Sequence, residues 1–310
     1  GGTYRTRVVV DPRLGRLGFL GGESPARVEV SYTYAFGGDL GAGPYDRSVR
    51  DAGRLPAPVD VTWQRGVLAS PDPDDPDAAD LRTHLDEAIA DWNAHVASLE
   101  SDDPDPVGII ALMDSATYRP SAGSAFEVVE IPERGTLYIV AADWPLLSPG
   151  GDEEAGIRFP GRIAPVGRRP HLLGRVIVRG TAPDGSPEPG RLVLEGLLIE
   201  GDVIVADSLL GGLDLRGSTV APGGTLSVEG VHARLALSLD RTACGPISAP
   251  DAVMEVHLSD SVVDGRPGSA VSAPNAVLDV RAVTFMGEVE AKSLEAIDSI
   301  FRDPMSVERR

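Results

Sequence analysis

Short runs of alternating apolar and polar residues dominate the chain, and they predict strands. The clearest early run extends from Arg27 to Tyr34, where Val or Tyr at every second position gives a half-buried strand one apolar face. Two further strands, from Arg5 to Val10 and from Arg16 to Leu20, flank a turn at residues 11–15. We therefore expect a small β-rich segment over residues 1–70.

One stretch follows the helical period instead. Between residues 77 and 99, apolar residues recur at steps of three and four and form one stripe along a helix, namely Leu81, Leu85, Ile89, Trp92, Val96 and Leu99. Asp75 is placed to cap this helix, and Pro76 suits its first position. Acidic, proline-rich linkers at residues 71–77 and 101–106 flank it, so residues 71–104 are expected to form a linker and one helix.

Beyond the helix, a ragged repeat predicts a stack of coils. Its marker is a short triplet in which a small or polar residue usually precedes apolar ones. The triplets begin at Leu197, Ser218, Thr242, Ser261, Thr284 and Ser299. A period of about 20 residues with several short strands and no helix is typical of a parallel β-helix, in which coils bury their inner faces only by stacking. Residues 105–310 are therefore expected to form a right-handed parallel β-helix, an all-β fold, with Val220, Val263 and Ile300 in the core.

The predicted helix has a place in this fold. An end of such a stack leaves strand edges and apolar side chains uncovered, and a helix across that end protects them. We expect the helix to cap the N-terminal end of the stack and to bury Leu81, Leu85, Ile89 and Trp92.

Two parts of the chain resemble known proteins. Residues 83–99, followed by 108–118 (Gly-Ile-Ile-Ala-Leu-Met-Asp-Ser-Ala-Thr-Tyr) and 137–143 (Leu-Tyr-Ile-Val-Ala-Ala-Asp), look like the capping helix and first coils of pectate-lyase-like β-helices. The front end, from Val10 to Arg47, resembles a block in large uncharacterised bacterial proteins, some of them associated with phage-tail-like or contractile-injection-like systems. These resemblances imply a fold and a bacterial setting, and they supply no catalytic residue.

Composition and charge narrow the function. Only 5% of the residues are aromatic, whereas Gly (36) and Pro (26) are abundant, as many short strands joined by tight turns require. The net charge of −19 argues against nucleic acid and against an anionic membrane surface, because both repel an acidic chain. No apolar stretch is long enough to cross a membrane. The single cysteine, Cys244, has apolar neighbours and is expected to be a buried structural thiol.

Carboxylates in the repeat are the candidates for chemistry. The β-helical enzymes that cleave polysaccharides place carboxylates, often with Ca²⁺ and an arginine, along one outer face. The corresponding candidates here are Asp207, Asp214, Asp240, Asp260 and Asp264, with Arg216, Arg241 and Arg266. Two carboxylates on adjacent coils could act as acid and base or bind a hard cation. The chain has 47 acidic residues, however, and Asp is a common residue at turns for structural reasons. No catalytic, cofactor-binding or metal residue is therefore assigned. Asp260 and Asp264 remain the catalytic candidates to test.

Other features favour structural roles. The acidic linker at 71–77 lacks the ligand spacing of a Ca²⁺ loop, and the loop from Gly37 to Gly43 lacks the Lys-Ser/Thr ending of a phosphate loop. The histidines have no metal-ligand spacing and are expected at the surface or in strands; they are His84, His95, His171, His232 and His257. The aromatic residues that could form a sugar platform are scattered, namely Trp63, Trp144, Tyr118 and Tyr138.

Three functions remain open. The favoured one is a non-enzymatic structural or adhesion module that binds protein partners or itself, within a phage-tail-like particle or a cell-surface assembly. The second is a polysaccharide lyase or hydrolase that uses the outer groove of the β-helix, and the third is a carbohydrate-binding module. The ends of the chain, Gly1-Gly2 and Arg309-Arg310, are typical of an excised fragment, so location stays open between a cytoplasmic assembly and an extracellular particle or surface.

Overall fold

The computed structural model describes residues 8–11, 16–19, 39–43, 45, 60–71, 81–100, 103–142 and 168–308. The chain divides into two compact units, residues 1–38 and residues 39–310.

The first unit contains an antiparallel hairpin. Strand β1 (Val8–Asp11) pairs with β2 (Arg16–Phe19), and Val8 lies opposite Phe19. The two strands predicted around the turn at residues 11–15 are therefore confirmed. The strand predicted at residues 27–34 lies outside the described residues.

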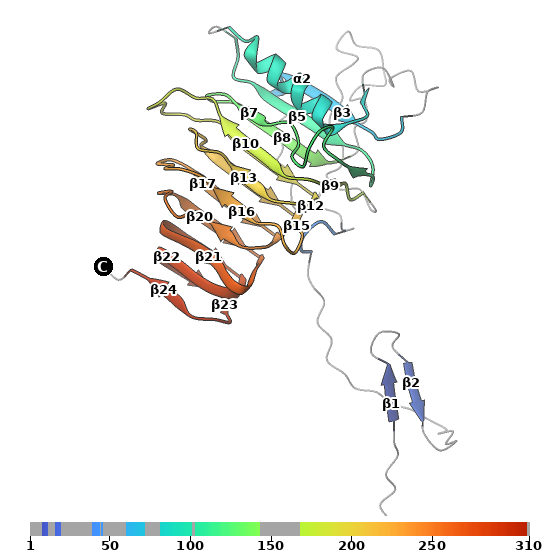
Figure 1. Cartoon of the computed structure of the whole chain (residues 1–310), viewed down its shortest axis with the longest axis vertical. Helices are drawn as coiled ribbons and strands as arrows, with labels where there is room; N and C mark the ends of the chain where they lie inside the picture. The colour runs from blue at the N-terminus through green and yellow to red at the C-terminus, as the bar shows by residue number, and fades with distance from the viewer. Residues whose placement is uncertain are drawn as a thin grey trace, which may run out of the picture. The chain divides into compact units, whose positions relative to one another are not determined.

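The second unit is a parallel β-helix whose coils follow one another from β3 to β24 (Figure 1). Each coil has three faces, named A, B and C in chain order. Face A comprises β3 (Trp63–Val67), β5 (Val107–Leu112), β8 (Thr136–Ala141), β11 (Arg191–Glu195), β14 (Gly212–Arg216), β17 (Ala236–Asp240) and β20 (Glu255–Ser259). Face B comprises β6 (Thr117–Tyr118), β9 (His171–Leu173), β12 (Leu198–Glu200), β15 (Thr219–Val220), β18 (Ala243–Cys244) and β23 (Ile300–Phe301).

Face C completes each coil. It comprises β7 (Val129–Ile131), β10 (Val176–Gly180), β13 (Val203–Val205), β16 (Leu226–Val228), β19 (Ile247–Ser248) and β24 (Met305–Val307). Two long strands, β21 (Val262–Arg281) and β22 (Thr284–Ile297), run through faces B, C and A in turn. A short strand, β4 (Leu81–Arg82), pairs with β3.

Strand register explains the core. One inward column on face A consists of buried apolar residues on successive strands, namely Leu137, Leu192, Leu213, Leu237, Val256 and Leu278. Because each coil repeats an apolar residue at the same position, the inner faces merge into one continuous core. The predicted all-β parallel β-helix is confirmed, and Val220 and Val263 are buried as expected.

The register also corrects one predicted core residue. Ile300 is 62% exposed rather than buried. Phe301 is the inward residue, because it aligns with Phe285 and Val263 on the neighbouring strands. The marker triplet at Thr284 is also shifted by one residue in register relative to the preceding triplet. Thr284 pairs with Val262, which is the second residue of the triplet that begins at Ser261.

The predicted capping helix is α2 (Leu85–Ala97), which lies across β7, β5 and β3 in Figure 1. As predicted, Leu85, Ile89 and Trp92 are buried, and Leu81 is buried as well. The helix begins at Leu85 and not near residue 77, so the predicted N-terminus, with Asp75 as cap and Pro76 at the first position, is wrong. Asp75 and Pro76 themselves lie outside the described residues. Residues 81 and 82 pair with β3 instead, and the carboxylate of Glu87 accepts a hydrogen bond from the His84 N–H at the helix start (3.3 Å).

The stack also begins earlier than the sequence predicted. Strand β3 precedes the helix and pairs in parallel with β5, with Trp63 opposite Gly108. The first coil therefore starts at residue 63 and not near 105. The helix is inserted between the first strand of face A and the second.

Side chains of α2 take the place of a missing strand beside β7. The Trp92 indole N–H donates to the carbonyl oxygen of Glu130 (2.7 Å). The Asn93 amide donates to the carbonyl oxygen of Val128 (2.7 Å) and accepts from the Glu130 N–H (3.0 Å). These bonds satisfy backbone groups that an uncovered strand edge would leave open.

A glycine makes room for the helix. Gly108 occupies the inward column in which the following strands carry Leu or Val. A Cβ atom at Gly108 would lie 2.3 Å from the Trp92 ring, which is closer than two non-bonded carbon atoms can approach. The missing side chain thus creates the space that the indole fills. Within the described part of the chain, no helix is both long and apolar enough to cross a lipid bilayer.

Candidate functional site

The outer side of face A brings two of the predicted carboxylates onto neighbouring strands. Asp214 lies in the centre of β14, and Asp240 ends β17, the next strand of the face. Strand register places Arg216 directly opposite Asp240. Asp214 itself lies opposite Ser238, so the two carboxylates stand on neighbouring strands without lying directly opposite each other.

Asp214 is held by two arginines. Arg191 Nη1 lies 2.6 Å from Asp214 Oδ1, and Arg216 Nη2 lies 2.7 Å from Asp214 Oδ2. The Asp214 side chain is only 5% exposed, whereas Arg191 reaches solvent. Both carboxylate oxygens are thus engaged by guanidinium groups within the protein.

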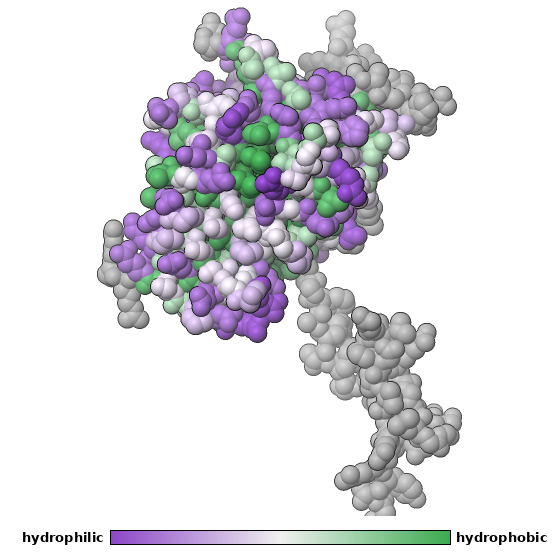
Figure 2. Space-filling model, viewed as in Figure 1, coloured by the Kyte–Doolittle hydropathy of each residue, from purple (hydrophilic) through white to green (hydrophobic). Residues whose placement is uncertain are grey.

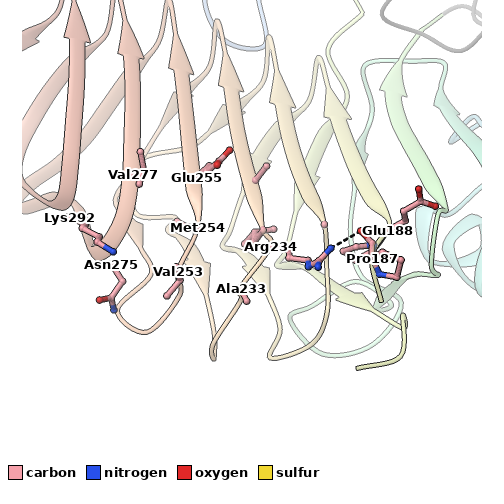
Figure 3. A pocket seen from close by; sticks show the side chains of 14 residues that line it. Pro187, Glu188, Ala233, Arg234, Val253, Met254, Glu255, Asn275, Val277 and Lys292 are labelled. Carbon is pink, nitrogen blue, oxygen red and sulfur yellow. Dashed lines mark hydrogen bonds between the residues drawn. The ribbon is translucent and has the colours of Figure 1, made fainter. Parts of the chain in front are cut away.

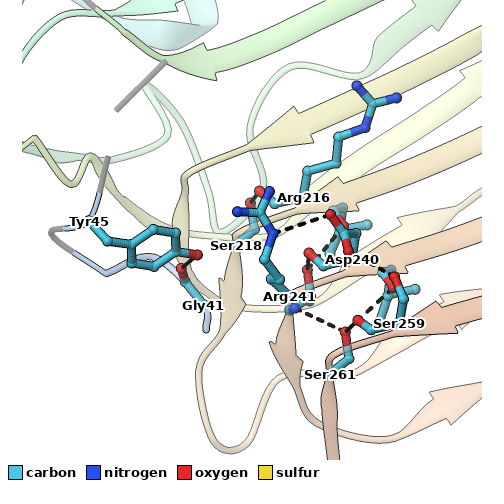
Figure 4. Close-up of polar contacts among 11 residues, drawn as sticks. Gly41, Tyr45, Arg216, Ser218, Asp240, Arg241, Ser259 and Ser261 are labelled. Atoms are coloured by element: carbon cyan, nitrogen blue, oxygen red, sulfur yellow. Dashed lines mark hydrogen bonds and ion pairs between the residues drawn. The ribbon is translucent and has the colours of Figure 1, made fainter. Parts of the chain in front are cut away.

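Asp240 is engaged in a similar way (Figure 4). The Ser259 hydroxyl donates to Asp240 Oδ1 (2.8 Å), and Arg241 Nε lies 3.3 Å from Asp240 Oδ2. The Arg241 side chain is buried at the corner between faces A and B. A buried guanidinium requires a carboxylate partner, so this pair serves the packing of the corner.

A ladder of hydroxyl groups lines the inside of the same corner. Ser218, Thr242 and Ser261 are buried on successive coils. The Thr242 hydroxyl lies within hydrogen-bonding distance of the carbonyl oxygens of Leu215 (3.0 Å) and Asp240 (3.1 Å). The polar first residues of three marker triplets are thereby explained, because they satisfy backbone groups where the chain turns between faces.

Asp260 belongs to the geometry of this corner. The residue that turns the chain has a positive φ on successive coils, and this column contains Gly196, Gly217, Arg241, Asp260, Ala282 and Asp298. Asp tolerates the left-handed region better than most residues. Its position therefore accounts for Asp260 without any catalytic role.

Asp264, the other catalytic candidate, lies on face B. It accepts two hydrogen bonds from the guanidinium of Arg266, at 2.8 Å from Nε and 2.6 Å from Nη2. Hydrogen bonding to Arg266 lowers the pKa of Asp264 to about 2. A carboxyl group that acts as a general acid needs a raised pKa, so Asp264 is poorly suited to protonate a leaving group near neutral pH.

The remaining candidates do not join the pair on face A. Asp207 is exposed at the corner that follows β13, between faces C and A. Asp260 and Asp264 lie at the next corner and on the next face. Among the described residues, no group of three His, Cys, Asp or Glu side chains could hold a metal ion.

The glycine-rich loop, in its described part, lies against the corner beside face B. The Gly41 N–H donates to the carbonyl oxygen of Arg241 (2.7 Å), and the Ala42 N–H donates to Thr219 Oγ1 (2.9 Å). Gly41 has a φ of +67°, and a Cβ atom there would lie 2.3 Å from Thr219 Oγ1. The predicted turn role of this glycine is confirmed; Gly37 and Gly38 lie outside the described residues.

The histidines and the cysteine mostly have structural positions. His171 is paired with Glu200 (3.1 Å), and His257 lies 3.6 Å from both Glu255 and Asp279. His232 contradicts the expectation of a surface or strand position, because it is buried in the loop between β16 and β17, where Nε2 lies 2.9 Å from the carbonyl oxygen of Glu229. Cys244 is buried as predicted, and burial raises the pKa of its thiol to about 12.

His84 and His95 both lie at α2. His84 precedes the helix and is exposed, while His95 stacks on Trp63 with ring centroids 6.1 Å apart. Burial lowers the pKa of His95, so its ring is neutral at pH 7. Neither position offers a metal-ligand arrangement.

The aromatic residues are used in packing. Trp63 contacts Trp92 edge to face, with ring centroids 5.5 Å apart. Tyr118 is buried, and its hydroxyl donates to Asp114 Oδ1 (2.8 Å). Tyr138 is partly buried on the outer side of face A, and Trp144 lies outside the described residues.

A cleft of about 550 Å³ runs along the edge where the chain enters face A, and the sequence did not predict it (Figure 3). Lys292 and Asn275 lie at one end, and Arg234 lies at the other, where its Nη1 donates to the carbonyl oxygen of Pro187 (2.9 Å). Val253 and Val277 are about half exposed and supply an apolar wall. In the sequence, Val253 stands just before one face A strand and Val277 stands at the start of the next. That these valines are exposed is visible only in the structure.

The fold and these positions define a parallel β-helix that is capped by a helix at its first coils and carries arginine-paired carboxylates on its outer side. No protein-family model matches the chain, and neither a curated protein nor a solved structure matches it significantly. The association with phage-tail-like systems therefore stays a prediction that rests on the sequence alone.

Proposed function

We propose that this chain is a non-enzymatic structural or adhesion module, a rigid acidic β-helix that holds a protein partner within a larger assembly of the phage-tail-like or cell-surface kind. The observation that supports this proposal most is the engagement of both oxygens of Asp214 and of Asp240 by arginines and a serine. The carboxylates of Asp214 and Asp240, which lie on neighbouring strands, thus bond to side chains of the protein itself.

The expected result is that the purified chain does not turn over polysaccharides. A panel of acidic and neutral polysaccharides, incubated with and without Ca²⁺, is assayed for new reducing ends and for the unsaturated products of a lyase. Asp260→Asn and Asp264→Asn variants are assayed in parallel. Turnover by the unaltered chain that disappears in either variant would overturn the proposal and favour the polysaccharide lyase or hydrolase.

A second candidate, a carbohydrate-binding module, is favoured by the cleft of Figure 3. Its charged groups balance, with Glu188 and Glu255 against Arg234 and Lys292, and an apolar wall lies beside them. Such a surface suits a neutral polar ligand better than a highly charged one. Measuring retention of the same polysaccharides, without turnover, separates this candidate from the structural module.

A further inference from the structure

The corner between faces B and C carries a second cleft, which has a volume of about 450 Å³. This volume lies within the usual range for small-molecule sites. Arg119 and Ser124 line the cleft from the segment between β6 and β7, Arg175 from the turn between β9 and β10, and Glu200 from the end of β12. Because β6, β9 and β12 are neighbours on face B, three successive coils build this corner cleft.

Glycines bring the coils close together at the floor of the corner cleft. A Cβ atom at Gly201 would lie 2.3 Å from the carbonyl oxygen of Gly174, and a Cβ atom at Gly174 would lie 2.6 Å from the Pro120 ring. The column continues beyond the cleft with Gly224 and Gly245, where a Cβ atom would again meet the carbonyl oxygen of the preceding glycine. The floor is therefore hollow because no side chain fits at these positions.

One wall of the corner cleft is held in place from α2. The Asp86 carboxylate accepts hydrogen bonds from the N–H groups of Ser121 and Glu127, the second at 2.8 Å. The carbonyl oxygen of Ser124 accepts a hydrogen bond from the Arg175 N–H (2.9 Å), which joins this wall to the next coil. The wall is thus formed before any ligand binds, and a preformed site lowers the cost of binding.

Two arginines of the corner cleft are not used in ion pairs. Among the residues that the structure describes, neither Arg119 nor Arg175 has a carboxylate partner. Arg175 Nη2 donates to the Ser124 hydroxyl oxygen (3.0 Å), which uses one of the five N–H groups of this guanidinium. By contrast, the arginines on the outer side of face A bind carboxylates. The corner cleft therefore concentrates positive charge in a chain whose net charge is −19.

The carboxylates near the corner cleft have other partners. Glu200 Oε2 lies 3.1 Å from His171 Nε2. Asp202, which follows on the same coil, accepts a hydrogen bond from the Thr225 N–H (2.9 Å). Asp86 binds the backbone of the wall, as described above. The remaining N–H groups of the two guanidinium groups are thus available to an anion from outside the chain.

The rest of the lining suits the uncharged part of a small molecule. Pro120 and Leu173 are half-buried and offer carbon surface, while Ser124 offers a hydroxyl group. Figure 2 shows hydrophilic residues beside hydrophobic ones on the upper part of the stack, where the first coils lie. A polar molecule with a hydrocarbon ring fits such a mixture better than a bare inorganic ion does.

We propose that the corner cleft binds a hexose-sized polar molecule that carries one carboxylate or phosphate group. Arg119 and Arg175 bind the anionic group, because a guanidinium donates parallel hydrogen bonds to two oxygens of a carboxylate or a phosphate. Pro120 and Leu173 contact the ring of the ligand. This site lies away from the paired carboxylates of face A, so the inference goes beyond the proposed structural role and does not rest on it.

Three sugars of similar size test the proposal on the full chain, namely glucuronate, glucose 6-phosphate and neutral glucose. Isothermal titration calorimetry at low salt measures their dissociation constants, and inorganic phosphate is the fourth probe. We expect glucuronate or glucose 6-phosphate to bind at least about tenfold more tightly than glucose and than inorganic phosphate, because hydrogen bonds to a charged group are the stronger ones. The tighter of the two charged sugars identifies the anionic group as carboxylate or phosphate.

Substitutions locate the binding. Arg119→Gln and Arg175→Gln should each weaken the charged sugar by about tenfold, because each removes a charged donor. The matched control, Arg281→Gln, makes the same change at an exposed arginine of β21 outside the cleft and should leave binding unaltered. Glu200→Gln removes a negative charge from the wall and should tighten binding about two- to threefold. Circular dichroism and the unfolding midpoint check that each variant folds.

Three results would each overturn the proposal. Equal dissociation constants for glucose and the charged sugars, or no binding of either charged sugar, would show that the corner cleft does not recognise an anion. Inorganic phosphate that binds as tightly as glucose 6-phosphate would show that the organic part of the ligand is not recognised. Equal weakening by Arg281→Gln and the cleft variants would place the binding elsewhere. Polysaccharide turnover, which would overturn the structural role, is assayed separately and does not enter these dissociation constants.

Discussion

Replacing Trp92 with Ala should lower the free energy of unfolding by about 3–5 kcal/mol, the range for removing a large buried aromatic side chain. Trp92 is fully buried beneath the first coils, and its indole N–H bonds to the Glu130 carbonyl oxygen. The substitution therefore opens a cavity and leaves a strand-edge acceptor unpaired. Trp92→Phe should cost less, because it loses the hydrogen bond and keeps most of the apolar volume. Equilibrium unfolding in urea measures both changes.

Gly108 supplies a control that a general loss of stability cannot imitate. Gly108→Ala should destabilise the native chain, because the added methyl group would meet the Trp92 ring. In the Trp92→Ala background the same methyl group enters the vacated space, so the cost should shrink or change sign. The double-mutant cycle measures this coupling. Additive effects would contradict the packing of α2 against β5.

Replacing Asp214 with Ala should lower the free energy of unfolding by about 3 kcal/mol, the lower end of the range for breaking a buried ion pair. The substitution leaves Arg191 and Arg216 adjacent without the carboxylate between them. The lower end applies because Arg191 reaches solvent and can turn towards it. Unfolding in urea at constant ionic strength provides the measurement.

Asp264→Ala is the matched control for Asp214→Ala. It removes the same side chain from an arginine pair, but Asp264 is 37% exposed and its partner Arg266 is also exposed. Exposed ion pairs contribute little, so the unfolding midpoint should hardly change. If Asp214→Ala were neutral or stabilising, Asp214 would not hold the outer side of face A together. A role in binding or chemistry would then become the better explanation, because functional sites often cost stability.

The sequence predicted the fold because its signals repeat. The apolar triplets recur once per coil, and the apolar stripe of the helix predicted its buried residues, including Leu85 and Trp92. Individual registers were harder, because coils differ in length and a shift of one residue exchanges the inner and outer sides of a strand. The exposed Ile300 shows this error. Strand β3 was missed because its partner β5 follows more than 40 residues later, and parallel pairing leaves no local signal.

The candidate site was predictable only in part. Arg216 lies two residues from Asp214 in one strand, so this pair could be suspected from the sequence. Arg191 lies one coil earlier, and only the register of β11 against β14 brings it to Asp214. The corner position of Asp260 depends on a positive φ, which its residue type permits but does not specify.

The helix α2 covers the first coils of the stack, and amide hydrogen exchange tests this cover most directly. Slow exchange is expected for β5 and β7, where α2 covers the edge, and for the central strands of face A. Fast exchange at β5 and β7 would contradict it.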